Sequence, residues 1–403
     1  MHCLILGKVW PEPTSTAAGR RTTDIIHSLQ ATGWRVSFAC AAQRSEFSVH
    51  LDSLGVAIYE WQPNDSVFDT WIAELAPDVV IFDRFMIEEQ FGWRVEKACP
   101  QALRVLDTSD LHCLREARHS QLKHGGTVDL YNEIALREIA AIHRSDLTLM
   151  ISEYEIELLR EQFAIPETQI VYWPFGVARC DRSFADYETR QHFIMIGSFM
   201  HAPNVDAARW CKQAIWPLIH QVLPAAELHC YGSYGEKYQS ELHAPKDGFL
   251  HKGRAQDALE AMAHYRVNLA PLRFGAGLKG KLFDGFATGT PSVGTSIAVE
   301  GVSGEIDWGC AVVDDPQRFA DAAIEVYTNS VTWSKVQSQG QYIVASRFDA
   351  AYWQPELPKI LEAAVAQLTT GRHTQFVGRM LRHHQHRSTE FMSRWIEAKN
   401  QSL

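Results

Sequence analysis

Short apolar runs rich in Val, Ile and Leu alternate with segments of helical period along most of the 403-residue chain. Strands that alternate with helices pair in parallel, because each helix carries the chain back to the starting edge of the sheet. The run at 79–82 is apolar throughout and is typical of a strand covered on both faces. The expected strands are 3–6, 35–39, 57–61, 79–82, 103–106, 147–151, 193–196, 227–231, 248–250, 267–271, 292–294 and 311–313.

This alternation occurs twice, and the interruption is the WPFGV segment at 173–177 with the polar stretch that follows it. A chain of 403 residues is also too long for one hydrophobic core. We therefore predict two Rossmann-like, doubly wound parallel-sheet domains, at residues 1–178 and 179–370. Residues 371–403 are predicted to form a helical tail that packs on the body.

Composition excludes several classes of protein. The formal net charge of -10 argues against broad nucleic-acid binding. The eight cysteines are scattered without a C-x-x-C pair, which favours reduced thiols over a zinc site. No apolar run approaches the roughly 18 residues that span a bilayer, and the N-terminus lacks the pattern of a signal peptide. We expect a soluble, cytoplasmic protein.

The densest functional signal is the segment at 275–281, GAGLKGK, which we call the glycine–lysine loop. It follows an apolar strand and opens a helix, whose free N–H groups and positive partial charge suit a diphosphate. Its glycines let the backbone approach a ligand closely, its lysines add positive charge, and the acid that follows can bind ribose hydroxyls. The residues expected to hold the nucleotide end of a ligand are Gly275, Gly277, Lys279, Lys281 and Asp284.

The same residues spell G-x-G-x-x-G at 275–280, which leaves an NAD-dependent oxidoreductase as an alternative. Glu300, 20 residues after Gly280, stands at the distance expected of the ribose-binding acid. Two features disfavour this interpretation. The fingerprint should open the first βαβ unit of its domain, and its acid should end the next strand, whereas Glu300 lies beyond 292–294.

The segment LFDGFATGTPSV at 282–293 resembles the LLEAMAxGxPVV signature of retaining group-1 (family 4) glycosyltransferases, which have the GT-B fold. Four other segments are similar to that family in the same order. They are DLTLMISEYE at 146–155, WPFGV at 173–177, IGSF followed by PNVD at 196–206, and AVEG at 298–301. The resemblance spans almost the whole chain and is strongest from 193 to 301.

The resemblance implies two domains that face each other across a cleft, and transfer of a sugar from a nucleotide-diphosphate sugar with retention of anomeric configuration. It also implies that the leaving phosphate helps to deprotonate the acceptor. Glu300, in the AVEG segment, is placed on the donor side. The family carries two glutamates eight residues apart where this chain has Ala276 and Asp284. The Arg and Lys that the family usually carries after the first strand of the second domain are not evident at 198–204, so Lys279 and Lys281 are inferred to neutralise the diphosphate instead. A catalytically degenerate nucleotide-binding relative is the other alternative. No cofactor is expected, and, without an Asp-x-Asp motif, no metal.

In the first domain, the resemblance places Gly19 and Arg20 in a loop that faces the cleft and can contact phosphate or acceptor. Asp110 and His112 follow the expected strand 103–106, and open α/β sheets bind ligands at the carboxyl ends of their strands. We predict that they are catalytic, His112 by a hydrogen bond to the transferring sugar or by relaying a proton. The acceptor can be a glycan, a lipid-linked group, a protein or a small molecule.

The tail from residue 371 is basic and rich in histidine, with apolar residues among the charges. One interpretation is an amphipathic helix that contacts a membrane surface peripherally or binds a partner. The other is a terminal helix packed on the body with its polar face in water. The sequence favours the second, because apolar and basic residues do not separate into a wide stripe.

Overall fold

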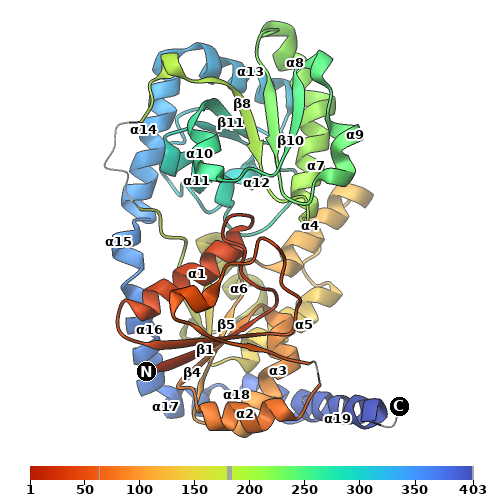
Figure 1. Cartoon of the computed structure of the whole chain (residues 1–403), viewed down its shortest axis with the longest axis vertical. Helices are drawn as coiled ribbons and strands as arrows, with labels where there is room; N and C mark the ends of the chain where they lie inside the picture. Colours follow the sequence, from red (N-terminus) through yellow and green to blue (C-terminus); the bar gives the residue numbers. More distant parts are fainter. Residues whose placement is uncertain (63, 179–183, 402–403) are drawn as a thin grey trace.

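The computed structural model describes residues 1–62, 64–178 and 184–401, and it folds into two lobes (Figure 1). Each lobe is built on one parallel sheet, as the sequence predicts. The predicted start of the second domain at residue 179 and the last two residues of the predicted tail lie outside the described residues.

The first lobe contains a seven-stranded sheet in the order β3-β2-β1-β4-β5-β6-β7, and every pairing is parallel. Its strands are β1 His2–Gly7, β2 Arg35–Cys40, β3 Ala57–Glu60, β4 Val79–Asp83, β5 Leu103–Asp107, β6 Leu147–Met150 and β7 Ile170–Tyr172. Its helices are α1 Ala17–Gln30, α2 Val67–Leu75, α3 Phe85–Ala98, α4 His112–His124, α5 Glu133–Arg144 and α6 Glu153–Phe163.

The second lobe contains a five-stranded parallel sheet in the order β10-β9-β8-β11-β12. Its strands are β8 Gln191–Ile196, β9 Leu228–Tyr231, β10 Phe249–Gly253, β11 Tyr265–Ala270 and β12 Ser292–Gly294. Its helices are α7 Ala202–Trp210, α8 Trp216–Val222, α9 Gln239–Leu242, α10 Ala258–Ala263, α11 Gly280–Thr288, α12 Ser296–Val299, α13 Pro316–Thr328 and α14 Ser330–Arg347.

The central strands form where the sequence is apolar at successive positions. All five residues of β4 are buried, and Val80 and Ile81 lie opposite Leu4 and Ile5 of β1. Each such side chain contributes about 1.5–3 kcal/mol by leaving water. The strand β7 was not predicted, because it is three residues long and directly precedes the WPFGV segment. The strand expected at 311–313 was wrong: these residues belong to no helix or strand and lie outside the sheet.

After α14 the chain crosses back to the first lobe, where a β-bridge joins Val177 to Asp349. Helices α15 Ala350–Trp353, α16 Glu356–Ala366, α17 Leu368–Thr374, α18 Phe376–Leu381 and α19 Arg387–Gln401 follow. Leu357 and Leu361 of α16 join the core cluster that contains Ile25 and Leu29 of α1. Helix α16, which the predicted boundary at 370 assigns to the second domain, therefore packs on the first lobe, at the opposite end of the molecule from β8–β12 (Figure 1).

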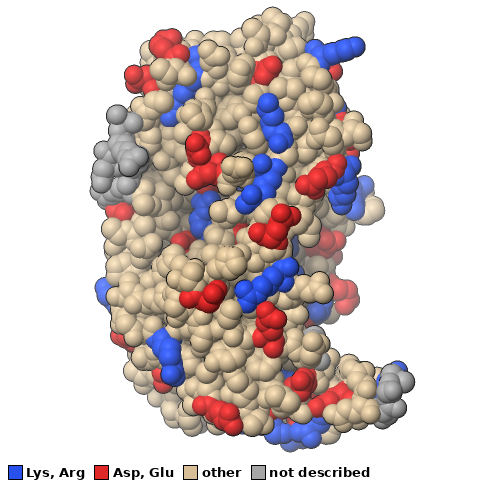
Figure 2. All heavy atoms as spheres, viewed as in Figure 1, with Lys and Arg blue, Asp and Glu red and all other residues tan. Residues whose placement is uncertain are grey.

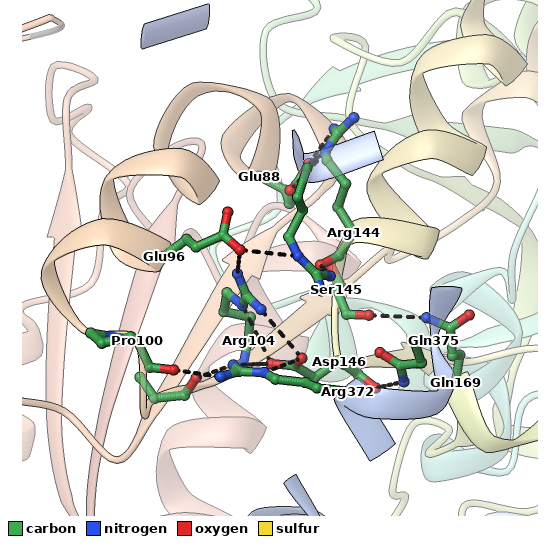
Figure 3. Close-up of polar contacts among 12 residues, drawn as sticks. Glu88, Glu96, Pro100, Arg104, Arg144, Ser145, Asp146, Gln169, Arg372 and Gln375 are labelled. Carbon is green, nitrogen blue, oxygen red and sulfur yellow. Dashed lines mark hydrogen bonds and ion pairs between the residues drawn. The ribbon is translucent and has the colours of Figure 1, made fainter. Parts of the chain in front are cut away.

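Buried charges fasten the tail to the first lobe (Figure 3). The guanidinium of Arg372 donates to both carboxylate oxygens of Asp146, at 2.7 and 2.6 Å, and Arg104 contacts the same carboxylate. Further along, Arg382 donates to the carbonyl of Arg144 at 2.9 Å, and Nδ1 of His386 lies 2.6 Å from Glu96. Because these charges are shielded from water, removing one partner of such a pair costs about 3–5 kcal/mol.

Both sheets reverse their strand order at a point that faces the other lobe. The reversal lies between β1 and β4 in the first lobe and between β8 and β11 in the second. Loops at the carboxyl ends of strands beside such a reversal form the usual ligand crevice of an open α/β sheet. Among the described helices, none is both long and apolar enough to cross a membrane.

Candidate active site between the two lobes

A cleft of about 640 Å³ separates the lobes, and loops from both of them line it. Figure 2 shows this hollow, with basic and acidic side chains interspersed around it. The first lobe contributes the loop after β1, the start of α1 and one face of α4; the second contributes the loops after β8, β9, β10 and β11. The lining includes Ala17, Ala18, Arg20, Ser109, Asp110, Arg115, His119, Ser198, His201, Asn204, Ser233, Arg254, Gly275, Ala276, Lys279, Gly280, Lys281 and Asp284.

The glycine–lysine loop lies between β11 and α11 and touches the first lobe. Gly277 has φ +64°, and a Cβ on it would lie 2.8 Å from the Cβ of Asp110, so only glycine fits without a shift. Its N–H donates to Oε1 of Glu155 at 2.6 Å. A Cβ on Gly280, the first residue of α11, would lie 3.0 Å from the Cβ of Ala17. The glycines thus permit close contact between lobes as well as access to the cleft.

Both lysines of this loop lie at the wall of the cleft, Lys279 buried and Lys281 half-buried. Nζ of Lys279 donates to the carbonyl of Gly277, and Nζ of Lys281 donates to Oδ1 of Asn204 at 2.8 Å. Burial lowers the pKa of Lys279 to about 8 and that of Lys281 to about 8. Neither ammonium has a carboxylate within ion-pair distance among the described residues, so an anion in the cleft would relieve their desolvation.

Arg20 and Asp284, predicted for opposite sides of the cleft, form an ion pair across it. Nη1 of Arg20 lies 2.6 Å from Oδ1 of Asp284, whose side chain is 9% exposed. Burial raises the pKa of Asp284 even though Arg20 opposes that effect. The carboxylate is therefore held in one orientation, one helical turn inside the start of α11.

Three helices begin at this cleft. The side chain of Thr16 caps α1 by accepting from the N–H of Gly19 at 3.0 Å. Helix α7 begins after His201 and α11 begins after Lys279. None of the three has an acidic residue in its first turn, so their positive partial charges are not neutralised locally. Converging helix N-termini favour a multiply charged anion such as a diphosphate.

Asp110 lines the cleft, whereas His112 lies behind it. Burial alone would raise the pKa of Asp110, but its ion pair with Arg115 outweighs burial and the pKa falls to about 2. His112 is the first residue of α4; its Nδ1 lies 3.2 Å from the carbonyl of Asp110 and 3.2 Å from Glu138. Glu138 of α5 also accepts from the backbone N–H of His112 at 3.0 Å, so the ring is held between the start of α4 and this carboxylate.

Gly19 and Glu300 also stand outside the lining of the cleft. Gly19 lies in the first turn of α1 rather than in the predicted loop. A Cβ on it would lie 2.5 Å from the backbone of Glu12, so this glycine lets the preceding loop fold against the helix. Both oxygens of Glu300 accept from Arg118 of the first lobe, at 2.8 and 2.6 Å. Arg118 donates as well to the carbonyl of Gly275 at 2.9 Å and so supports the glycine–lysine loop from behind.

Sequence reasoning missed three residues that shape the site: Glu155, Arg118 and Asn204. Glu155 belongs to the SEYE segment quoted above, but nothing in its spacing shows that it accepts from Gly277 of the other lobe. Burial raises the pKa of Glu155 to about 8, and within the described structure its Oε2 has no hydrogen-bond partner. Arg118 lies on α4 among several charged residues and carries no distinguishing pattern in the sequence.

Solved structures with the same two-lobed architecture are glycosyltransferases of the GT-B class. HepE from Anabaena, crystallised with UDP and glucose, superposes with a TM-score of 0.68 at 13% identity, covering 89% of this chain and 99% of its own. Sucrose-phosphate synthase from Thermosynechococcus elongatus gives 0.67 at 11% identity, covering 91% and 99%. A glycosyltransferase from Rickettsia africae gives 0.65 at 12% identity, covering 90% and 98%. At these identities the likeness establishes the GT-B fold of this chain.

The second lobe matches a known family model. Residues 190–329 match the family model of the group 1 glycosyl transferases, a range that includes the glycine–lysine loop and Asp284. No curated protein sequence matches the chain. The second lobe thus contains a group 1 glycosyl transferase domain, the whole chain has the GT-B fold, and the predicted resemblance is confirmed.

Proposed function

We propose that the cleft binds a nucleoside-diphosphate sugar and that the enzyme transfers the sugar to an acceptor with retention of anomeric configuration. The observation that carries this proposal is the convergence of three helix N-termini with Lys279 and Lys281 on one cleft. None of the three helices has an acidic residue in its first turn. Stabilising a departing diphosphate requires positive groups fixed in advance, because reorienting them during the reaction would cost activation energy.

The donor would lie with its diphosphate at the start of α11 and its ribose toward Asp284. An ionised carboxylate accepts hydrogen bonds from both ribose hydroxyls, and Asp284 is already held by Arg20. Ser198 and Ser233, which lie at the carboxyl ends of β8 and β9, line the same side of the cleft. Oγ of Ser233 is buried and has no protein partner within the described structure, so it is available to a ligand.

In the proposed reaction the bond between the anomeric carbon and the diphosphate oxygen breaks as the acceptor oxygen approaches from the same face. The acceptor proton passes to the leaving phosphate oxygen, and the nucleoside diphosphate departs with the electron pair. Lys281 and the N–H groups of α11 stabilise its charge. Asp110, whose low pKa keeps it ionised, would orient the acceptor by accepting a hydrogen bond.

We assign His112 a positioning role in place of the predicted proton relay. Its ring contacts the carbonyl of Asp110 and the carboxylate of Glu138, and it lies outside the lining of the cleft. Replacing His112 by Gln would keep a hydrogen bond to the Asp110 carbonyl. That variant should retain most of the turnover rate and keep the pH profile of the wild type. If His112 relayed a proton, the variant would lose most of its turnover rate and its pH profile would change.

A thermal-shift panel tests the donor assignment. Each of several uridine, guanosine and adenosine diphosphate sugars is added to the wild type, to Lys281→Ala and to Lys359→Ala. Lys359 is the matched control, because it is an exposed lysine of α16 paired with Glu356. We expect at least one donor to stabilise the wild type and the control but not Lys281→Ala. Absence of stabilisation by every nucleotide-sugar would overturn the assignment.

Two further measurements separate this function from its alternatives. Stabilisation by NAD or NADH alone would favour the oxidoreductase, although the glycine motif follows β11 rather than β8, the first strand of its sheet. Nucleotide binding without turnover on any acceptor would favour the degenerate relative.

Proton NMR of the product reports the anomeric configuration directly, and an inverted product would refute retention.

The seven described cysteines are free thiols, and six of them are buried. Free thiols persist in a reducing compartment, so we place the reaction in the cytoplasm. Cell fractionation tests this location, and recovery of the enzyme in an extracellular fraction would contradict it.

A further inference from the structure

The last helices present a face that packs against nothing in the described structure. Helix α18, the π-helical turn Arg382–His386 and α19 form one continuous helical segment from Phe376 to Gln401. Figure 1 shows α19 projecting along the base of the first lobe, away from the second lobe. The outer face of this segment, defined by Phe376, Met380, Arg387, Phe391, Trp395 and Lys399, is exposed.

Large apolar side chains on this face are unusually open to water. Phe376 is 69% exposed, Phe391 70% and Trp395 60%. Aromatic residues scattered singly on a surface need no explanation, but here they recur along one side of one helical segment. Nζ of Lys399 lies 5.3 Å from the ring centroid of Trp395, so cationic and aromatic groups are adjacent.

The acidic side chains of the segment face the first lobe. Between 376 and 401 the sequence contains only two acids, Glu390 and Glu397. Glu390 pairs with Lys97 of α3 at 2.9 Å, and Glu397 accepts from the hydroxyl of Ser66 at 2.6 Å. Ser393 is buried on the same inner side, where Arg94 donates to its Oγ at 3.0 Å. The outer face is therefore left with positive charge alone, in a chain whose net charge is -10.

The inner side is fixed by the buried network of Figure 3 and its continuation to His386. Arg382 and His386 project from the π-helical turn into the first lobe, where they meet Glu96 at 3.1 and 2.6 Å. Since a π-helical turn inserts a residue into the helical repeat, it sets which side chains of α19 face outward. The orientation of the outer face thus follows from the way the segment is anchored.

We propose that this outer face docks the enzyme on an anionic lipid bilayer. A helix that lies in the interface of a membrane needs aromatic and apolar side chains on one side, with cations beside them to meet lipid headgroups. A second copy of the chain fits less well, because a two-fold contact through this face would bring Arg387 and Lys399 against like charges. The inference is independent of the donor assignment.

Vesicle co-sedimentation of the full-length protein tests the proposal. Vesicles of phosphatidylcholine with one quarter phosphatidylglycerol are compared with vesicles of phosphatidylcholine alone, at low and high salt. The wild type should sediment with the anionic vesicles, less so as salt screens the headgroups, and only weakly with the neutral ones. Two double variants then separate the aromatic from the cationic groups of the face. They are Phe391→Ser with Trp395→Ser, and Arg387→Gln with Lys399→Gln.

Each double variant should lose about tenfold or more in vesicle affinity, because each removes either the inserted rings or the headgroup contacts. The matched control pairs Val331→Ser with Tyr342→Ser, which are exposed apolar residues of α14, and it should bind like the wild type. Thermal unfolding of every variant reports whether the protein stays folded.

Three results would overturn the proposal: no sedimentation of the wild type, equal sedimentation with neutral vesicles, or wild-type binding by both double variants. Analytical ultracentrifugation adds a fourth. A dimer that the Phe391 and Trp395 pair dissolves would assign the face to a second copy of the chain instead.

Discussion

Gly277 occupies the point where the donor side of the site touches the first lobe. Its φ of +64° and the 2.8 Å approach of a Cβ to Asp110 make Gly277→Ala unfavourable twice over. We expect about 1 kcal/mol from the backbone conformation and a further loss as the loop shifts, which should weaken donor affinity about tenfold or more. Calorimetric titration with a nucleotide-sugar measures the effect.

The matched control is Gly125→Ala. Gly125 has φ +74°, but nothing lies within 4 Å of a Cβ placed there. It should lose only the conformational contribution to stability and bind the donor normally. Equal donor affinity in the two variants would mean that the contact with Asp110 does not hold the loop.

The buried lysines predict how donor binding depends on pH. Burial lowers the pKa of Lys281 to about 8, below its unfolded value of 10.5. In the ligand-free protein, the cost of the buried charge is fully present below pH 8 and is relieved as the pH rises from about 8 to 10.5. A diphosphate needs the charged form, so donor affinity should fall above pH 8, approaching about tenfold per pH unit for each lysine.

Titrations at pH 7, 8 and 9 test this dependence, using a nucleotide-sugar because it lacks a terminal phosphate that would itself titrate. In Lys281→Ala only Lys279 remains in the loop, so the pH dependence should be about half as steep. An affinity that stays constant from pH 7 to 9 would show that the lysines do not meet the diphosphate.

At the scale of elements, the tail helices depend on a few buried ion pairs. Arg372 binds both oxygens of Asp146, so Arg372→Ala leaves a buried carboxylate with less compensation and should lower the free energy of unfolding by about 3 kcal/mol. Lys97→Ala removes the exposed pair with Glu390 and should cost less than about 1 kcal/mol. Hydrogen exchange in α17–α18 measures both, and equal protection would contradict the account.

An element could be predicted from the sequence when its own residues carry the signal for it. The apolar run at 79–82 sufficed for β4, because burial on both faces favours apolar residues, and Leu103, Val105 and Leu106 sufficed for β5 although Arg104 lies among them. The run at 311–313 has the same composition but does not join the sheet, since β12 is the last strand on that side and nothing in the run itself records this. Strand pairing is a property of the whole sheet.

The site residues also differ in whether the sequence alone could place them. Lys281 and Asp284 could be placed because a strand, a glycine turn and a helix start follow one another in the sequence. Glu300 and His112 could not, since their partners Arg118 and Glu138 lie 182 and 26 residues away. A side chain that faces a ligand and one that faces a buried partner look alike until the lobes are assembled.

The whole molecule is held closed by contacts that cross the cleft. They include Arg118 with Glu300, Arg20 with Asp284, and the hydroxyl of Tyr234, which donates to Glu12 at 2.9 Å. Because Arg118 also supports Gly275, Arg118→Leu should open the ligand-free protein and weaken donor binding about tenfold or more.

Small-angle scattering tests this opening as a larger radius of gyration than that of the wild type. The control is Arg137→Ala, which removes an exposed pair with Glu89 and a contact with the ring of Phe85, both within the first lobe, and should leave the radius unchanged. If Arg118→Leu scattered like the wild type, its ion pair would not be what keeps the lobes together.

In the proposed function, a nucleoside-diphosphate sugar binds between the lobes with its diphosphate on Lys281 and the start of α11. Calorimetric titration of the most stabilising nucleotide-sugar into the wild type, Lys281→Ala and Lys359→Ala tests it most directly. We expect one site per chain, an affinity lowered at least about tenfold in Lys281→Ala, and wild-type affinity in Lys359→Ala. Wild-type affinity in Lys281→Ala would contradict it.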